Sequence, residues 1–342
     1  MDKNINKNLN PKNISFSKNI TKDSFTNGIL DNTFIIFNSI NNLLLLIYSN
    51  RKSFITFNLI NNKKINEIKN AHSEDISNFR HCLDKINKID YIISISKINN
   101  NIKLWNVMHF ECLLNIEKIN KYGILYSSCF LHDNNNIYII TSNWNFIKAD
   151  NIKVFDLKGN KLNEIKNSNE GIFYIDTYYD KNLSKIYIIT NNKSYIKSYD
   201  YKQNILYHYY SDNMQYIEHC SPIIYNKNNL VELIDICTEG IIRIWNFNTG
   251  DLINKIQIMK LDPFHINGVC LWNDDYIYIG CDDKEIKLIE IKSGNIINNL
   301  KGHTECVLCI KKINHPNYGE CIISQGRGFD QIRLWVDKVK YK

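Results

Sequence analysis

The chain lacks any long apolar run, and it contains almost no alanine. No uninterrupted apolar stretch in its 342 residues approaches the roughly 18 that a membrane-spanning helix needs. Its first residues, M-D-K-N-I-N-K-N-L-N-P-K-N, contain neither the apolar centre nor the small-residue cleavage site of a secretory signal. Alanine occurs only at Ala71 and Ala149, within a skew toward Asn, Ile and Lys that is typical of an AT-rich coding sequence. We therefore expect a protein without a membrane span, located in the cytoplasm, with the nucleus as the alternative.

A framework of paired cysteine spacings is also missing. The ten cysteines are scattered from Cys82 to Cys321, and in this compartment we expect them to be reduced thiols. Cys306-Val-Leu-Cys309 has the spacing of a zinc or redox pair, but it falls in a predicted first strand, where residues three apart face opposite sides. No second pair follows, and structural zinc needs four convergent ligands. The sequence therefore predicts neither a metal nor another cofactor.

The charge of the chain has no concentrated block. The formal net charge of +7 is spread along the sequence, and it mostly reflects solubility. No cluster of aromatic and basic residues resembles an RNA-binding motif, so we do not expect nucleic acid as a partner.

A six-residue pattern recurs seven times along the chain. Successive copies end 44 to 50 positions apart, and one strand pattern per period of this length is typical of a propeller or a solenoid. The copies are S-F-I-T-F-N at 53–58, N-I-K-L-W-N at 101–106, N-I-K-V-F-D at 151–156, Y-I-K-S-Y-D at 195–200, I-I-R-I-W-N at 241–246, E-I-K-L-I-E at 285–290 and Q-I-R-L-W-V at 331–336.

Each period divides into short β-branched and aromatic runs that are separated by turn residues. Four strands and three turns per period predict one antiparallel blade. The third and fourth units keep the third strand but lose the clear turns around it. The predicted strands are 33–38, 43–49, 53–59 and 65–69 in the first unit, 222–225, 231–237, 241–247 and 252–258 in the fifth, and 266–272, 276–280, 285–291 and 296–300 in the sixth.

The last unit is one strand short. The sequence stops a few residues after the seventh pattern, and residues 14–19 can supply the missing fourth strand. Pairing of the two ends would remove an exposed sheet edge. We therefore predict an all-β, seven-bladed propeller over 14–342, with four antiparallel strands per blade, a ring closed by an N-terminal strand, and no helix of useful length. Residues 1–13 are expected to be a flexible tail.

The repeats resemble WD40 repeats, in which Gly-His precedes a Trp-Asp pair by some thirty residues. Gly302-His303 with Trp335 has this form, and Ala71-His72 with Trp105 is a degraded instance. Trp-Asp itself never occurs. The resemblance runs from about residue 14 to the end, and it implies seven blades whose last blade is completed by the first strand. The last two units are also similar to uncharacterised protist WD-repeat proteins.

This resemblance implies a buried structural tetrad in each well-formed blade. His303, Ser324, Asp330 and Trp335 match it, and His72 with Trp105 are candidates for a second one. A histidine, a serine and an aspartate in one blade also have the composition of a hydrolase triad. The structural interpretation is favoured because a tryptophan donor completes the set and buried polar groups need partners. We therefore predict a protein that is not an enzyme.

The resemblance also implies that the loops between second and third strands lie on one face, around the central channel, where such propellers commonly bind partners. The third unit is expected to insert a long loop after Thr141, and the seventh unit has the loop G-R-G-F-D-Q. Aromatic side chains on such loops are candidate anchors for a partner. The candidate residues of this face are Trp144, Phe146, Arg327, Phe329, Arg51, Lys193 and Glu239.

Two functions fit these patterns. The first is a scaffold or adaptor that binds one or more proteins within a larger complex. The alternative is a propeller that binds a phosphoinositide or a phosphopeptide through Arg51, Lys193 and Arg327, although the F-R-R-G string of phosphoinositide-binding members is absent. Nothing in the sequence points to a homo-oligomer. Capture of a stable protein partner favours the first function, and signal on a lipid or phosphopeptide array favours the second.

Overall fold

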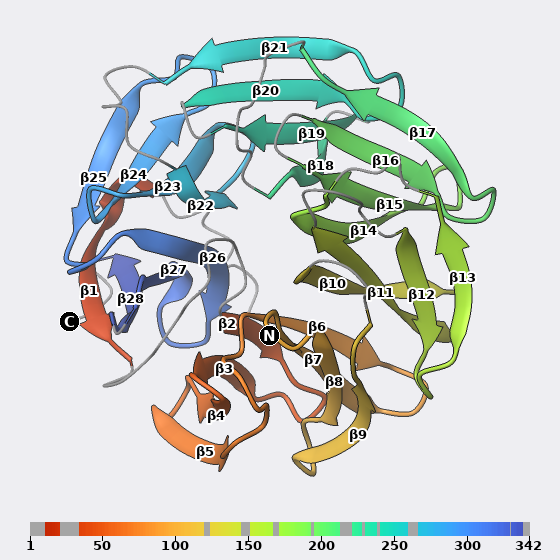
Figure 1. Ribbon diagram of the computed structural model, residues 1–342. Helices are drawn as coiled ribbons and strands as arrows, with labels where there is room; N and C mark the ends of the chain where they lie inside the picture. Colours follow the sequence, from red (N-terminus) through yellow and green to blue (C-terminus); the bar gives the residue numbers. More distant parts are fainter. Residues whose placement is uncertain are drawn as a thin grey trace, which may run out of the picture.

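The molecule is a ring of seven four-stranded antiparallel sheets (Figure 1). The computed structural model describes residues 11–20, 34–119, 124–144, 151–166, 171–192, 195–212, 221–227, 230–237, 240–258, 266–328 and 330–337. Within these residues the only helical turn is a 3-10 turn at Pro11–Asn13. No helix of the described part is long and apolar enough to cross a membrane.

The strands follow the chain blade by blade, from the innermost strand to the outermost. Blade 1 contains β2 (Phe34–Asn38), β3 (Leu44–Asn50), β4 (Ser53–Asn58) and β5 (Lys63–Ile68); blade 2 contains β6 (Asn78–Asp84), β7 (Ile89–Ser96), β8 (Asn101–Asn106) and β9 (Glu111–Ile116). Blade 3 contains β10 (Ile124–Asp133), β11 (Asn136–Trp144), β12 (Ile152–Asp156) and β13 (Lys161–Ile165); blade 4 contains β14 (Tyr174–Asp180), β15 (Lys185–Asn191), β16 (Ile196–Asp200) and β17 (Ile205–Tyr210).

The remaining blades complete the ring. Blade 5 contains β18 (Ile223–Lys227), β19 (Leu230–Ile236), β20 (Ile241–Asn246) and β21 (Leu252–Gln257). Blade 6 contains β22 (Ile266–Leu271), β23 (Tyr276–Cys281), β24 (Glu285–Glu290) and β25 (Ile296–Lys301). Blade 7 contains β26 (Val307–His315), β27 (Gly319–Gly326), β28 (Ile332–Asp337) and, as its outermost strand, β1 (Ile14–Asn19).

The recurring six-residue pattern is the third strand of every blade. Successive side chains of a strand face opposite sides, so one third strand serves two interfaces between blades. In β8, Ile102 and Leu104 are buried against residues of blade 3, whereas Trp105 packs in the cluster shared with blade 1. The ring of Trp105 meets the ring of Phe54 in blade 1 edge to face, with centroids 5.2 Å apart. The repeat therefore encodes both the strand and the packing of neighbouring blades.

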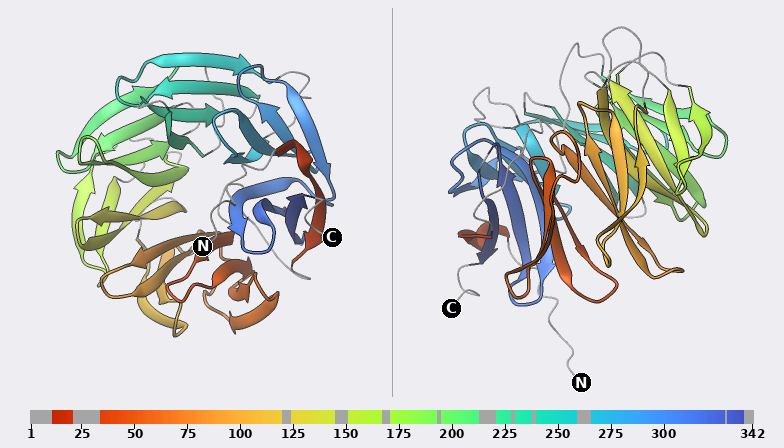
Figure 2. Two further views of the ribbon diagram at one scale, coloured as in Figure 1. Left: turned by 180° about the vertical axis from the view of Figure 1, so that it is seen from behind. Right: turned by 60° about the horizontal axis from the view of Figure 1, so that its bottom comes forward.

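The first strand closes the ring as the sequence predicts. β1 pairs antiparallel with β28, with Ser17 opposite Trp335, and lies beside the blue strands of the last blade in Figure 2. Ile14 is completely buried, and the hydroxyl of Tyr278 donates to the carbonyl of Pro11 at 2.7 Å. Of the predicted tail 1–13, residues 11–13 form a 3-10 turn with Pro11 buried, which corrects the tail at these positions. Residues 1–10 lie outside the described residues, so their assignment to a tail stays a prediction.

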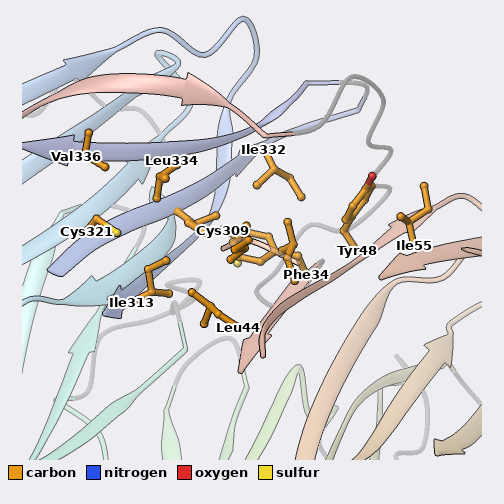
Figure 3. Packing of buried hydrophobic residues seen from close by; sticks show 13 residues of the cluster. Phe34, Leu44, Tyr48, Ile55, Cys309, Ile313, Cys321, Ile332, Leu334 and Val336 are labelled. Atoms are coloured by element: carbon orange, nitrogen blue, oxygen red, sulfur yellow. The ribbon is translucent and has the colours of Figure 1, made fainter. Parts of the chain in front are cut away.

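The first and last blades share one apolar core. Phe34, Leu44 and Tyr48 of blade 1 lie against side chains of β26, β27 and β28 (Figure 3). Cys309 is one of these side chains and is completely buried, while Cys306 precedes β26 and is only half-buried. The expectation that both cysteines lie in this strand was therefore wrong for Cys306, because pairing of β26 begins at Val307.

The predicted architecture of seven four-stranded blades is confirmed, and the predicted strands of units one, five and six agree with the observed ones to within two residues. Units three and four also form complete blades, although their turns are weakly marked in the sequence.

Candidate functional site on the loop face

Four buried side chains of blade 7 form one hydrogen-bonded chain. His303 lies in the loop between β25 and β26, Ser324 in β27, Asp330 in the loop before β28, and Trp335 in β28. Trp335 Nε1 donates to Ser324 Oγ at 2.7 Å, and Ser324 Oγ lies 2.6 Å from His303 Nε2. His303 Nδ1 lies 2.7 Å from Asp330 Oδ2. With the ring proton on Nδ1, each donor in the chain meets an acceptor.

The electrostatics of this chain keep the histidine neutral and the aspartate ionised. Burial lowers the pKa of His303, and this outweighs the opposite effect of Asp330. Burial by itself would raise the pKa of Asp330, but the hydrogen bond from His303 and the neighbouring backbone amides hold it at about 2. The backbone amide of Thr304 also donates to Asp330 Oδ2, at 3.2 Å.

Gly326 makes room for this carboxylate. A Cβ at position 326 would collide with the Asp330 side chain, so the glycine before Arg327 is needed for close approach. Ser324 is completely buried, and its hydroxyl already accepts from the Trp335 ring. The four side chains therefore join the strands of the blade, and the serine has no exposed face on which to meet a substrate.

Blade 2 contains a shorter version of this network. His72 Nε2 lies 2.7 Å from Ser94 Oγ, and Trp105 Nε1 donates to the same oxygen at 2.8 Å. Burial, with a smaller effect of Lys103, lowers the pKa of His72 to about 3. Sequence reasoning missed Ser94, although a spacing of eleven residues before the tryptophan is common to Ser94 and Ser324.

Blade 5 has a cluster of charged side chains where blade 7 has Ser324 and its cross-strand neighbour. Asp235 faces Arg243 across β19 and β20, as Ser324 faces Arg333 in blade 7. Arg243 contacts Asp235 at 2.6 Å and Asp212 at 2.8 Å, and Lys255 contacts Asp212 at 2.9 Å. Burial by itself would raise the pKa of Asp212, but the two basic side chains lower it. Sequence reasoning missed this cluster, whose signal is an aspartate at the position of Ser324.

The predicted face is only partly described. Arg51 is exposed in the turn between β3 and β4, with a φ of 54°, and Arg327 is exposed between β27 and β28. The two turns belong to neighbouring blades and to the same face of the ring. Phe146, Lys193, Glu239 and Phe329 lie outside the described residues.

Trp144 is a strand residue, which corrects the expected loop. Strand β11 continues to Trp144 and pairs with β10, so Trp144 lies opposite Ile124. The next strand, β12, follows β11 only as far as the pair of Thr141 and Lys153. Beyond that pair β10 and β11 form a two-stranded ribbon, and Ser142 Oγ donates to the Ser127 carbonyl at 3.2 Å. Residues 142–144, which were expected in the loop, therefore belong to β11, and residues 145–150 lie outside the described residues.

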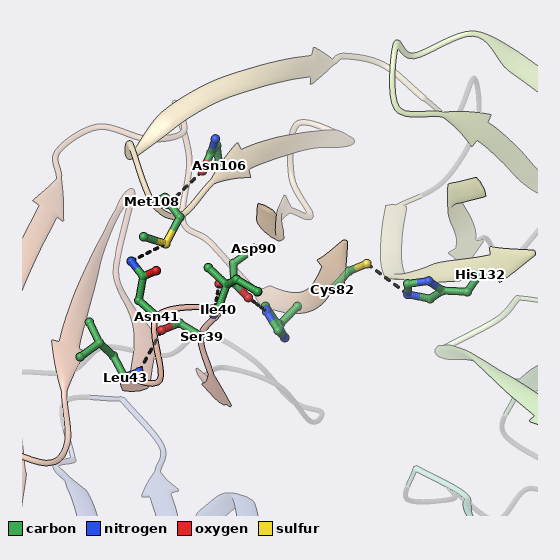
Figure 4. A network of polar contacts seen from close by, with 10 residues as sticks. Ser39, Ile40, Asn41, Leu43, Cys82, Asp90, Asn106, Met108 and His132 are labelled. Atoms are coloured by element: carbon green, nitrogen blue, oxygen red, sulfur yellow. Dashed lines mark hydrogen bonds and ion pairs between the residues drawn. The ribbon is translucent and has the colours of Figure 1, made fainter. Parts of the chain in front are cut away.

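The opposite face contains contacts that connect neighbouring blades (Figure 4). Asp90 accepts from the Ile40 amide at 2.7 Å and lies 2.8 Å from His81 Nε2. Farther along, Cys82 Sγ lies 3.1 Å from His132 Nε2, beside a cavity of about 460 Å³ between the first turns of blades 2 and 3. Burial raises the pKa of Cys82 to about 12, which favours the neutral thiol over the nucleophilic thiolate. In the described part of the chain, no group of three or more His, Cys, Asp or Glu side chains is arranged to hold a metal ion.

Seven blades, an N-terminal strand in the last blade and His–Ser–Trp networks define a WD40-like propeller. No family model matches the chain. Over 72 residues it is 25% identical to the U3 small nucleolar RNA-associated protein 21 homolog of Schizosaccharomyces pombe. The match covers 21% of this chain and 8% of the relative, so the chain spans only a small part of the length of the protein that it matches.

Proposed function

We propose that this chain is a non-catalytic scaffold or adaptor that binds one or more proteins of a larger complex. The contact would be made by the loop face, which is the face of the ring that carries the loops between the second and third strands. The observation that carries the proposal is the ribbon of β10 and β11, which extends beyond β12 and ends at Trp144. The third blade has its four paired strands without this extension. Tryptophan is among the residues that contribute most to protein interfaces.

Two further observations support the proposal. The histidine, serine and aspartate of blade 7 are all engaged in a buried network, which accounts for them without catalysis. The partial relative is named as a U3 small nucleolar RNA-associated protein, which favours membership of a multi-component assembly. We propose a cytoplasmic location for this chain. The nucleus is the alternative, and the name of the relative favours it. We propose a protein as the direct partner. Its similarity to protist WD-repeat proteins stays a prediction.

The phosphate-binding alternative has no observation in its favour. Arg51 and Arg327 are exposed in neighbouring blades, but the third basic residue, Lys193, lies outside the described residues.

The test is affinity capture with Trp144→Ala and a matched control. The wild-type chain is expected to retain a stable protein partner after nuclease treatment, as identified by mass spectrometry. Trp144→Ala is expected to weaken retention by about 30-fold, because removing a central tryptophan anchor typically costs about 2 kcal/mol. Leu113→Ala on the outer strand β9 removes an exposed apolar side chain of a different blade and should leave retention unchanged.

Equal retention by Trp144→Ala and Leu113→Ala, with wild-type melting temperatures, would contradict a contact at the ribbon. Loss of the partner on nuclease treatment would contradict a direct protein partner, and absence of any partner of the wild-type chain would contradict the scaffold itself.

A further inference from the structure

The outer strands of the blades present open sheet edges around the ring. Among the described strands each of them pairs on one side only, and an unpaired edge is a template for another strand. Proteins commonly block such edges with charged side chains. Six outer strands have at least one: Lys63, Lys64 and Glu67 in β5, Glu111 in β9, Lys161 and Glu164 in β13, Lys255 in β21, Lys301 in β25 and Lys18 in β1.

Strand β17 of blade 4 is the exception. Its sequence, I-L-Y-H-Y-Y, contains no Lys, Arg, Asp or Glu, and it forms the outer rim of the ring in Figure 1. Ile205 is 53% exposed, and Leu206 and Tyr209 are 48% exposed. Tyr179 and Leu183 are also exposed, at the end of the blade where β17 begins. Blade 4 therefore supplies five of the thirteen exposed large hydrophobic side chains of the described residues.

Three other side chains of β17 contact blade 5 and anchor the strand there. Tyr210 is 1% exposed, and its hydroxyl donates to the Phe247 carbonyl at 2.7 Å. His208 Nε2 lies 2.6 Å from the carbonyl of Asn248, and the Tyr207 hydroxyl donates to the same carbonyl at 3.3 Å. These contacts hold the strand in its extended form, so a partner strand would not have to order it first.

The charged side chains near β17 are already engaged within the protein. Lys197 of β16 lies directly opposite Tyr209 and is buried, with its ammonium group 4.6 Å from the centroid of the Tyr195 ring and 5.8 Å from that of the Tyr209 ring. At one end Lys202 pairs with Asp133, and Lys185 pairs with Asp200 at 2.9 Å. At the other end Asp212 is held by Arg243 and Lys255. Because these charges are paired or buried, a charged partner strand would find no available counter-charge along this edge and would lose hydration. An uncharged apolar strand matches both the exposed side chains and the absence of charge.

We infer that the outer edge of β17 is a docking site for an extended, uncharged, apolar strand of a partner protein. The backbone of the partner would continue the sheet of blade 4 as a fifth strand, and Ile205, Leu206 and Tyr209 would receive its side chains. Strand addition of this kind takes its affinity from main-chain hydrogen bonds and its specificity from alternate side chains. This surface lies on the rim, and the inference does not depend on the loop face.

Hydrogen exchange of the purified full chain tests the inference, with the capped peptide Thr-Val-Thr-Val-Thr-Val as the probe. The outward amides of β17 are expected to exchange rapidly in the chain alone. Saturating peptide is expected to slow them by about tenfold or more and to leave β21 unaffected. Leu206→Lys should abolish this protection because it places a charge on the edge. The matched variant Leu252→Lys, at an exposed position of β21, should retain it.

Several outcomes would overturn the inference. Protection of β17 without peptide would mean that another segment of the chain already covers the edge, and protection that increases with protein concentration would mean that a second copy does. Equal protection of all outer strands would show non-specific association. Equal binding of a peptide with glutamate in place of threonine would refute the preference for an uncharged strand. None of these outcomes involves Trp144, so failure here and failure of the loop-face contact are distinguishable.

Discussion

At the scale of single residues, one serine hydroxyl connects two buried rings in blade 7. Ser324 Oγ accepts from Trp335 Nε1 and lies against His303 Nε2, and all three side chains are buried. Removing the hydroxyl leaves both rings without this partner. The cost of such a change comes mainly from the groups left behind, at about 1–3 kcal/mol for each buried group.

Ser324→Ala is therefore expected to lower the free energy of unfolding by about 2–5 kcal/mol, measured by urea denaturation. Ser96→Ala is the matched control. Ser96 is also completely buried, but its hydroxyl has no hydrogen-bond partner in the described structure. Its replacement should change stability by less than about 0.5 kcal/mol. Equal costs for the two variants would show that burial of a serine, and not the network, determines the effect.

At the scale of secondary-structure elements, β1 completes a blade that begins about 290 residues later in the chain, at β26. Ile14 is completely buried in a cluster with Tyr278 and Trp335, so the strand contributes apolar packing as well as backbone pairing. Without β1, the outer edge of β28 and one face of this cluster would be exposed to solvent.

Deletion of residues 1–19 is expected to lower the melting temperature by more than about 5 °C and to produce concentration-dependent association, followed by calorimetry and light scattering. Deletion of residues 1–10 keeps β1 and the Pro11 carbonyl that Tyr278 contacts, so it should behave like the full chain. A monomeric 1–19 deletion with an unchanged melting temperature would contradict closure of the ring by β1.

The elements show how much the sequence could predict. Third strands and turns are encoded locally, by β-branched and aromatic runs between Asn, Asp and Gly, so the blades and their closure could be predicted. The extension of β11 to Trp144 depends on pairing with Ile124, which no local pattern indicates. The pairing of Arg243 with Asp212 joins residues 31 positions apart, so it follows from the folded ring and not from a motif.

At the scale of the whole molecule, buried histidines make stability depend on pH. Burial lowers the pKa of four of them: His72, His81, His303 and His315. A histidine whose pKa is lower in the folded state is protonated first in the unfolded state, so acid favours unfolding. For His72 the effect begins near the ordinary value of 6.5 and continues to about pH 3. Asp330 has a pKa of about 2 in the folded state and an ordinary value of 3.8, so below pH 3.8 its protonation also favours the unfolded state.

The free energy of unfolding is therefore expected to fall steadily from pH 7 to pH 4.5, with each fully contributing histidine adding about 1.4 kcal/mol per pH unit to the slope. Urea denaturation across this range measures the slope. His72→Asn should reduce it by up to that amount, because the titrating group is gone. Ser94→Ala removes the hydroxyl that His72 and Trp105 share but keeps the imidazole, so it should lower stability at pH 7 and leave most of the slope. If both variants flatten the slope equally, the pH dependence comes from the integrity of blade 2 and not from titration of His72.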